Sequence, residues 1–288
     1  MKKSFHIIGL GRVGQTFATV IPQSGRWRLA CAVSRSGGGV REDNVVCPIV
    51  PRIGLLPRAD AVLVCTPDNA IEEAAAELAR LPWLSAQTLV VHFSGAKTIG
   101  ALNAVVKCGA TIGSLHPVFA FADVAQSVRS LRGNLCALEA DGAAAMAVLH
   151  DLADAAGLRA FEIPSAQKAR YHAALSAASN FSVTLAAFAQ DLLRPLNLPE
   201  PLARDLVCNL LRQSVENLSH LPPVQALTGP VVRGDDSTVA AHLAALDADE
   251  RRLYRMFALS TLALAAPRLG AEAQEALRSV LTGGEPLS

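Results

Sequence analysis

Three glycines close to the amino terminus have the spacing of a phosphate-binding turn. Gly9, Gly11 and Gly14 form the pattern Gly-x-Gly-x-x-Gly, directly after a short, mainly apolar run at residues 5–8. The first permits a tight turn, the second lets a pyrophosphate approach the main chain, and the third lets the next helix pack against the sheet. The N–H groups and partial positive charge at the start of that helix favour phosphate binding. Unless this is an ordinary glycine-rich turn, the predicted dinucleotide contacts are Gly9, Leu10, Gly11, Arg12, Val13 and Gly14.

The end of the second predicted strand favours NADP over NAD as the cofactor. In dinucleotide-binding folds an Asp or Glu at this point binds the 2′-hydroxyl of the adenosine ribose. Here the strand is followed by Ser34, Arg35 and Ser36, without an acid. A guanidinium can pair with the additional phosphate of NADP, and the two hydroxyls can add hydrogen bonds. The alternative is that Arg35 is a solvated loop residue.

Residues after a third strand, at 61–65, are expected to shape the same pocket. Thr66 and Pro67 would form its floor beside the cofactor, and Asp68 or Asn69 would cap the following helix. A capping role for Asp68 is favoured over a catalytic one.

Two more strand ends carry groups that could act on a substrate. Ser94 and Gly95 follow a strand at 88–92, and could hold a carboxylate or touch a nicotinamide. His116 ends the next strand and is of a type that titrates near neutral pH. The alternatives are an ordinary turn at Ser94 and a structural histidine at position 116.

A polar stripe on a long helical segment supplies candidate proton donors, which a hydride transfer usually requires. Lys168, His172 and Ser176 are four residues apart, so they share one helix face, and the stripe drifts towards Asn180. Alanines surround the stripe, so we expect this helix to be buried and its polar stripe to line a cleft facing the nucleotide-binding domain. His172 is the first choice of donor and Lys168 the second. The alternative is that these are polar groups of a helical core.

A loop at residues 226–236 contains two glycines and a proline between predicted helices. Loops of this kind often carry function. Thr228 and Arg233 are therefore candidate substrate contacts, and Arg233 could instead contact a partner subunit. An interhelical turn with an exposed arginine is the alternative.

Composition narrows the class of protein. The chain has 288 residues, 51% of them hydrophobic, and a net charge of +1 without a large basic cluster, so we expect no nucleic-acid partner. The longest uncharged stretch of the carboxyl-terminal half is too polar for a bilayer span. Six scattered cysteines without a Cys-x-x-Cys pair favour a reducing cytoplasm and no metal site.

Alternating strands and helices in the first half predict a doubly wound α/β domain with a parallel sheet. The expected strands span residues 5–10, 28–34, 61–65, 88–92, 111–115, 135–139 and 160–163. The expected helices span 13–20, 69–81, 99–106 and 142–156, whereas 37–57 is loose. After Pro164 the pattern is entirely helical. We therefore predict an α/β domain at residues 1–164 and an all-α domain at 165–288.

These motifs together resemble a known family. The residues that carry the resemblance are the glycine turn followed by Thr66-Pro67-Asp68, Ser94-Gly95-Ala96, Ser114-Leu115-His116-Pro117, Tyr171-His172-Ala173-Ala174, Ala178-Ser179-Asn180 and Leu227-Thr228-Gly229-Pro230. The chain resembles candidate NADP oxidoreductases that join a Rossmann-like domain to a helical domain of unknown function. The wider superfamily includes 6-phosphogluconate dehydrogenase, β-hydroxyacid dehydrogenases and pyrroline-5-carboxylate reductase.

The resemblance implies a 6-phosphogluconate dehydrogenase-like helical domain that often dimerises, and a substrate cleft between the domains. The β-hydroxyacid dehydrogenases pair a helix lysine with an asparagine one turn later, whereas Lys168 is followed at that spacing by His172. The prediction is a cytoplasmic, homodimeric, NADP-dependent oxidoreductase of a small carbonyl, imine or hydroxy acid. The alternative is a non-catalytic NADP-binding sensor or scaffold.

Overall fold

The computed structural model of the protein describes residues 2–34 and 47–283. The chain forms two compact units, residues 1–177 and residues 178–288. The division falls inside helix α6 (Lys168–Leu192), whose first turns belong to the first unit. Helical structure nevertheless starts directly after Pro164, with the short turn η6 (Ser165–Gln167).

An eight-stranded sheet with the order β3-β2-β1-β4-β5-β6-β7-β8 forms the centre of the first unit. Its strands are β1 (Lys3–Ile8), β2 (Trp27–Val33), β3 (Ile49–Val50), β4 (Ala61–Val64), β5 (Leu89–His92), β6 (Thr111–Pro117), β7 (Leu135–Ala140) and β8 (Arg159–Glu162). Every strand of the sequence prediction is present, and only β3 was missed. The expected parallel sheet is confirmed for every strand pair of the described residues except one, because β7 runs antiparallel to β6.

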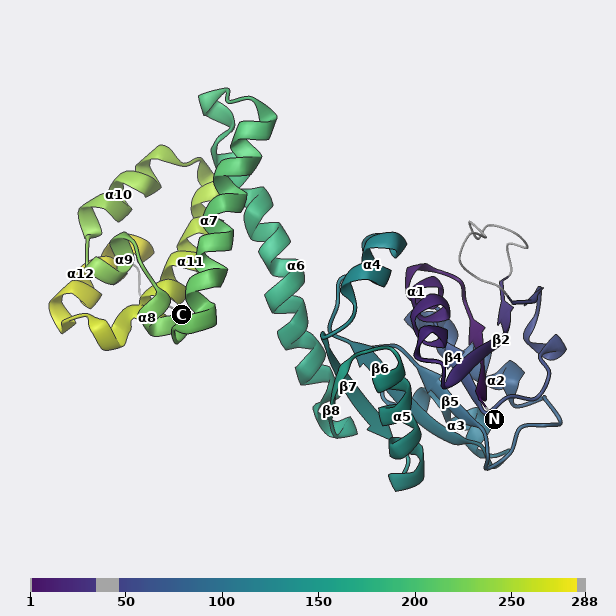
Figure 1. The fold of residues 1–288 in the computed structure, drawn as a ribbon. Helices are drawn as coiled ribbons and strands as arrows, with labels where there is room; N and C mark the ends of the chain where they lie inside the picture. The colour runs from purple at the N-terminus through teal and green to yellow at the C-terminus, as the bar shows by residue number, and fades with distance from the viewer. Residues whose placement is uncertain (1, 35–46, 284–288) are drawn as a thin grey trace. The chain divides into compact units, whose positions relative to one another are not determined.

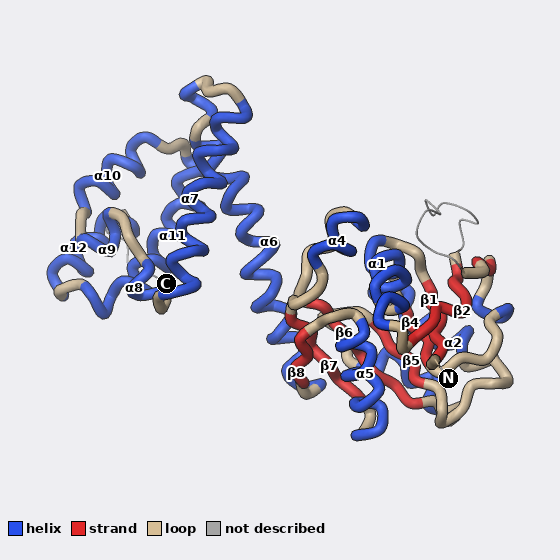
Figure 2. Tube along the Cα trace, viewed as in Figure 1, coloured by secondary structure: helices blue, strands red, loops and turns tan. Residues whose placement is uncertain are grey.

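Helices cover both faces of this sheet (Figures 1 and 2), so the central strands β1, β4 and β5 are buried along nearly their whole length. One face packs against α1 (Arg12–Val20), α4 (Val124–Ser130) and α5 (Ala143–Ala155). The other packs against α2 (Ile71–Leu78), the turn η5 (Ile99–Leu102) and α3 (Asn103–Val106). Successive residues of β4 alternate between the two cores: Leu63 belongs to the first, and Val62 and Val64 belong to the second.

The second unit is helical throughout the residues described, up to 283. Beyond the end of α6 it contains α7 (Glu200–His220), α8 (Pro223–Ala226), α9 (Pro230–Arg233), α10 (Asp236–Ala245), α11 (Ala248–Ala265) and α12 (Ala271–Thr282). Its core is small and is built by α9 to α12 around buried residues such as Val239 and Leu262. Within residues 2–34 and 47–283, no helix is long and apolar enough to cross a membrane.

Candidate functional site

The turn between β1 and α1 requires glycine at two of its three glycine positions. Gly9 has a φ of +94°, and a Cβ there would lie 2.9 Å from the carbonyl oxygen of Cys65. A Cβ on Gly14 would lie 2.0 Å from the carbonyl oxygen of Gly9. Gly11 differs, because nothing lies within 4 Å of the position its Cβ would take. The fold therefore requires Gly9 and Gly14, whereas the bare backbone at Gly11 leaves the start of α1 open to a ligand.

A cavity of about 790 Å³ opens over this turn, where the strand order reverses between β1 and β4. Ligands of doubly wound sheets bind at this reversal, at the carboxyl ends of the strands. Its volume lies within the range of small-molecule pockets, roughly 300–1,000 Å³. The predicted cofactor contacts that line it are Gly9, Leu10, Gly11, Arg12, Val13, Ser34, Thr66 and Pro67.

The other predicted cofactor contacts lie elsewhere. Gly14 packs beneath the turn, and Ser94 and Gly95 follow β5. Arg35 and Ser36 lie outside the described residues.

Sequence reasoning missed a second group of cavity residues. They come from the segment after β3, from one face of α2 and from the loop before α4, and they are Pro51, Arg52, Ile53, Ala70, Glu73, Ala74, Glu77 and Phe121. The α2 residues recur at helical spacing, which could have revealed a shared face. Strand β3 has only two residues, which is too short for its sequence pattern to predict the strand or the position of Arg52 after it.

The cavity also contains a polar group without a partner. The Thr66 hydroxyl is buried and makes no hydrogen bond within residues 2–34 and 47–283. A buried hydroxyl without a partner carries a desolvation cost that a ligand acceptor or donor would remove. Together with the open Gly11 backbone, this orphan hydroxyl makes the cavity chemically suited to a phosphate-bearing ligand.

Ser94 is held inside its turn. Its hydroxyl donates to a carboxylate oxygen of Asp68 at 2.7 Å and accepts from the backbone N–H groups of Ala96 and Lys97. Asp68 therefore does not cap the following helix, and neither does Asn69, because η4 (Asp68–Ala70) and α2 begin without side-chain caps. The capping expectation is wrong because the two strand-end turns are bonded to each other instead.

His92 supports the same turn from beneath. Its Nδ1 accepts from the backbone N–H of Ser94 at 3.1 Å, and its Nε2 lies 3.1 Å from the carbonyl oxygen of Thr98. Burial lowers the pKa of His92 to about 4, so the ring is neutral at pH 7.

Three separate sequence motifs meet beside this turn. A Cβ on Gly95 would lie 2.6 Å from Nε2 of His116 and 2.6 Å from Cδ2 of His172. The two imidazole centroids are 6.1 Å apart. The structure therefore brings the end of β5, the end of β6 and the first turns of α6 together around Gly95, whose missing side chain makes the close approach possible.

Tyr171, which lies next to His172, orients His116. Its hydroxyl is 2.9 Å from Nδ1 of His116. Burial lowers the pKa of His116 to about 4, assisted by the nearby charges of His172 and Lys168, and burial raises the pKa of Tyr171 to about 12. Both groups are therefore neutral at pH 7. The hydrogen bond occupies Nδ1, which leaves Nε2 facing Gly95.

Lys168 is buried, with 1% of its side chain exposed, and its ammonium makes two hydrogen bonds within the described part of the chain. It donates to the Ser114 hydroxyl and to Oε2 of Glu139 at 2.7 Å. The other oxygen of Glu139 accepts from the Ser165 hydroxyl at 2.6 Å and the backbone N–H of Ile99 at 3.0 Å. Sequence reasoning missed Glu139, although it is the one acid in the otherwise uncharged run of β7.

Burial and pairing act in opposite directions on this ion pair. Burial alone would raise the pKa of Glu139, but hydrogen bonds from Lys168, Ser165 and Ile99 hold it below the usual value. Burial lowers the pKa of Lys168, and the Glu139 carboxylate opposes that shift. Each group therefore stabilises the charged form of the other. The Lys168 ammonium has a structural role, because it is bonded to neighbouring elements of the fold.

The remaining predicted residues belong to the second unit. Asn180 is exposed on α6, and Thr228 and Arg233 are exposed beside α9. Arg233 forms an ion pair with Asp235, at 4.0 Å. Their roles stay predictions.

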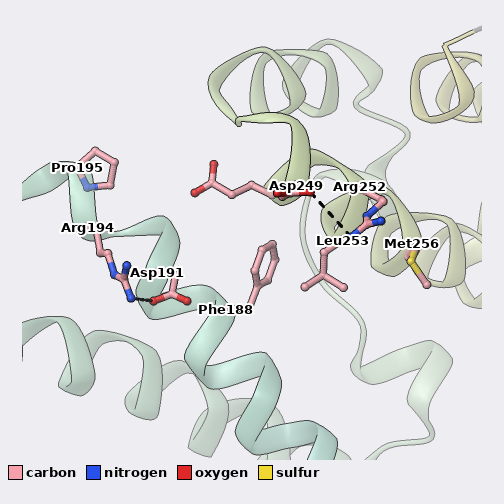
Figure 3. Close-up of a pocket in the computed structure, with 9 residues that line it drawn as sticks. Phe188, Asp191, Arg194, Pro195, Asp249, Arg252, Leu253 and Met256 are labelled. Atoms are coloured by element: carbon pink, nitrogen blue, oxygen red, sulfur yellow. Dashed lines mark ion pairs between the residues drawn. The ribbon is translucent and has the colours of Figure 1, made fainter.

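A second cavity, of about 640 Å³, lies within the second unit between the end of α6 and the start of α11 (Figure 3). Phe188, Leu253 and Met256 give it apolar walls. Four of its charged side chains form ion pairs, Arg194 with Asp191 and Arg252 with Asp249. It contains none of the predicted site residues that the structure describes.

Over residues 2–34 and 47–283, no group of three His, Cys, Asp or Glu could hold a metal ion.

The fold and the glycine turn define the class of protein: a Rossmann-like domain followed by a helical domain. Residues 1–117 match the family described as Rossmann-like domain, and residues 134–261 match the domain of unknown function DUF2520. The chain therefore joins an N-terminal Rossmann-like domain to a C-terminal DUF2520 domain, which confirms the resemblance drawn from the motifs. No curated protein matches the sequence significantly.

Solved structures share this architecture. The chain is similar to a candidate NADP oxidoreductase from Bacteroides fragilis, with a TM-score of 0.75 and 23% identity over 91% of this chain and 98% of that one. It is similar to a Thermotoga maritima protein, TM1727, with a TM-score of 0.65 and 25% identity over 97% and 98%. It also resembles the NADP-bound pyrroline carboxylate reductase of Plasmodium falciparum, with a TM-score of 0.61 and 14% identity over 98% of both chains.

The two kinds of glycine in the turn can be told apart by substitution. Gly14→Ala places a methyl group against the Gly9 carbonyl, and we expect the free energy of unfolding to fall by about 1–3 kcal/mol. Gly11→Ala meets no atom, so its cost should be within about 1 kcal/mol while nucleotide binding is lost. Urea unfolding and calorimetry measure both effects. A Gly14→Ala variant as stable as the parent protein would contradict this assignment.

The buried ion pair should dominate the stability of the first unit. Lys168→Met leaves Glu139 charged and buried, and we expect it to lower the free energy of unfolding by about 3–5 kcal/mol. Lys97→Met is the matched control, because Lys97 pairs with Glu72 near the surface and should cost at most about 1 kcal/mol. Urea unfolding followed by circular dichroism compares them, and equal costs would argue against a special role for Lys168.

Proposed function

We propose that the protein is an NADP-dependent oxidoreductase that transfers hydride to or from a small carbonyl, imine or hydroxy acid. The observation that carries this proposal is the open backbone at Gly11, which leaves the N-terminus of α1 exposed in a cavity at the strand-order reversal. The likeness to the structure of a candidate NADP oxidoreductase and to that of an NADP-bound reductase supports the choice of reaction and cofactor.

The residues of the cavity fit such a cofactor in the following way. The backbone from Gly9 to Val13 would hold the pyrophosphate, and the Thr66 hydroxyl would gain a partner. The bound nicotinamide would supply or accept the hydride. The protein would then need only to orient the substrate and to handle one proton.

We assign to His172 the transfer of the proton to or from the substrate, and to His116 a hydrogen bond that polarises the reacting group of the substrate. A histidine with a pKa near 4 is neutral at pH 7, so His116 serves as a hydrogen-bond donor or acceptor at Nε2 rather than as an acid. Tyr171 holds its ring. Lys168, the second candidate from the sequence, is bonded to Glu139 and Ser114, which favours a positioning role for it.

The alternative is a protein that binds NADP as a sensor or scaffold without turnover. The burial of Lys168 favours this alternative, because the helix lysine that related dehydrogenases use in catalysis is here consumed in an ion pair. The cluster of His116, His172 and Tyr171 favours an enzyme instead, because these side chains can take part in proton transfer.

We further propose that the protein is a cytoplasmic homodimer formed through its helical unit. Leu202, Leu206 and Leu210 follow one another at four-residue steps on α7 and are 44–66% exposed. A second copy would bury such a stripe. All six cysteines are free, which agrees with a reducing compartment. Sedimentation of the protein at micromolar concentration should give a dimer, and a monomer would contradict this proposal.

The enzyme and the sensor can be separated by one set of measurements. We expect calorimetry to detect NADPH binding, and a panel of keto acids, imines and hydroxy acids to include a compound that changes nicotinamide absorbance. His172→Ala should then lower kcat by roughly 10²–10⁴-fold without changing NADPH affinity. His220→Ala, an exposed histidine on α7, is the control and should change neither.

Each outcome has a distinct meaning. Tight NADPH binding without turnover on any compound would favour the sensor. Unchanged turnover of His172→Ala would remove that residue from the mechanism. Absence of binding to either nicotinamide nucleotide would overturn both functions.

A further inference from the structure

The segment after β3 adds a cation to the cavity at the point where the adenosine ribose is recognised in this class of fold. β3 is the edge strand and pairs in parallel with β2, with Ala32 opposite Ile49 and Val33 opposite Val50. The N–H of Ser34 donates to the carbonyl oxygen of Val50 at 3.2 Å. Ser34 and Arg52 therefore leave neighbouring strand ends at the same edge of the sheet, and both line the cavity.

Arg52 is exposed, and its guanidinium has no partner among the residues that the structure describes. Across residues 2–34 and 47–283 it makes no side-chain hydrogen bond and no ion pair. Two other arginines of the first unit, by contrast, are bonded: Arg26 pairs with Asp151 and Asp154, and Arg58 donates to Gln87. An unpaired guanidinium lining a cavity can make the bidentate contacts that a phosphate accepts.

The wall of the cavity that α2 contributes carries negative charge. Glu73 and Glu77 are four residues apart on α2, so they occupy one helix face, and both line the cavity. A phosphate entering this space is repelled by them unless a cation pairs with it. Two arginines of the described residues line the cavity. Arg12 lies in the glycine turn, and Arg52 lies after the edge strand, next to the strand end that carries Ser34.

We propose that Arg52 binds the 2′-phosphate of NADP and sets the preference for NADP over NAD, a contact from β3 in addition to those expected after β2. The proposal rests on the proposed function, because it requires a dinucleotide in this cavity. It assigns Arg52 a role in cofactor specificity and none in the chemical step. The charge of Arg52 would offset the repulsion between the additional phosphate and the carboxylates of Glu73 and Glu77.

Calorimetry with oxidised cofactors tests this without turnover. Arg52→Ala should weaken NADP binding by roughly 10–100-fold, as expected for loss of a charge-assisted contact, and should change NAD binding by less than about twofold. Arg52→Lys should restore part of the loss, because it keeps the charge but not the bidentate geometry. Arg58→Ala, which precedes β4 at the other end of the strands, is the control and should leave both affinities unchanged.

Two adenosine fragments isolate the contact further. Adenosine 2′,5′-bisphosphate should lose affinity for Arg52→Ala, whereas adenosine 5′-phosphate, which lacks the second phosphate, should not. Unfolding curves should coincide with those of the parent protein, because the side chain is exposed and unbonded.

The outcomes separate this inference from the function on which it rests. Equal weakening of NADP and NAD by Arg52→Ala, or no effect on either, would overturn the role of Arg52 while leaving nucleotide binding intact. A parent protein that binds neither cofactor, or prefers NAD, would overturn the NADP assignment and this inference together.

Discussion

A buried ion pair between Lys168 and Glu139 joins the parts of the first unit that carry the candidate chemistry. Its hydrogen bonds connect β6 through Ser114, β7 through Glu139, the start of η5 through Ile99, and η6 through Ser165. Two charges in a low-dielectric interior are tolerable only with partners on every side. Because each partner comes from a different element, those elements are held in one arrangement.

The position of the catalytic candidates follows from this constraint. Lys168 is the first residue of α6, so its attachment to the sheet determines where Tyr171 and His172 lie one turn later. From there the two residues reach His116 at the end of β6 and Gly95 after β5. The buried ion pair therefore positions Tyr171 and His172, which lie one helical turn further along α6.

The carboxyl edge of the sheet contains two contrasting polar regions. Ser94, His92 and Asp68 are hydrogen-bonded to one another and to the neighbouring backbone, which holds the strand-end turns in place. Over the glycine turn, the Gly11 backbone is uncovered and the Thr66 hydroxyl lacks a partner within residues 2–34 and 47–283. A rigid neighbourhood beside an unsatisfied one is the arrangement expected of a pre-organised ligand site.

Local patterns in the sequence determined most elements of the first unit, with β3 and α4 among the exceptions, and the position of its glycine turn. Apolar runs bounded by turn residues predicted each strand except β3, and the glycine spacing reported a steric requirement that the structure reproduces at Gly9 and Gly14. The tertiary structure alone decided the rest. Strand direction at β7, the binding of Ser94 by Asp68 and the pairing of Lys168 with Glu139 depend on residues far apart in the chain. Periodicity reports which face of an element is buried, but it carries no information about which distant polar group will satisfy a buried charge.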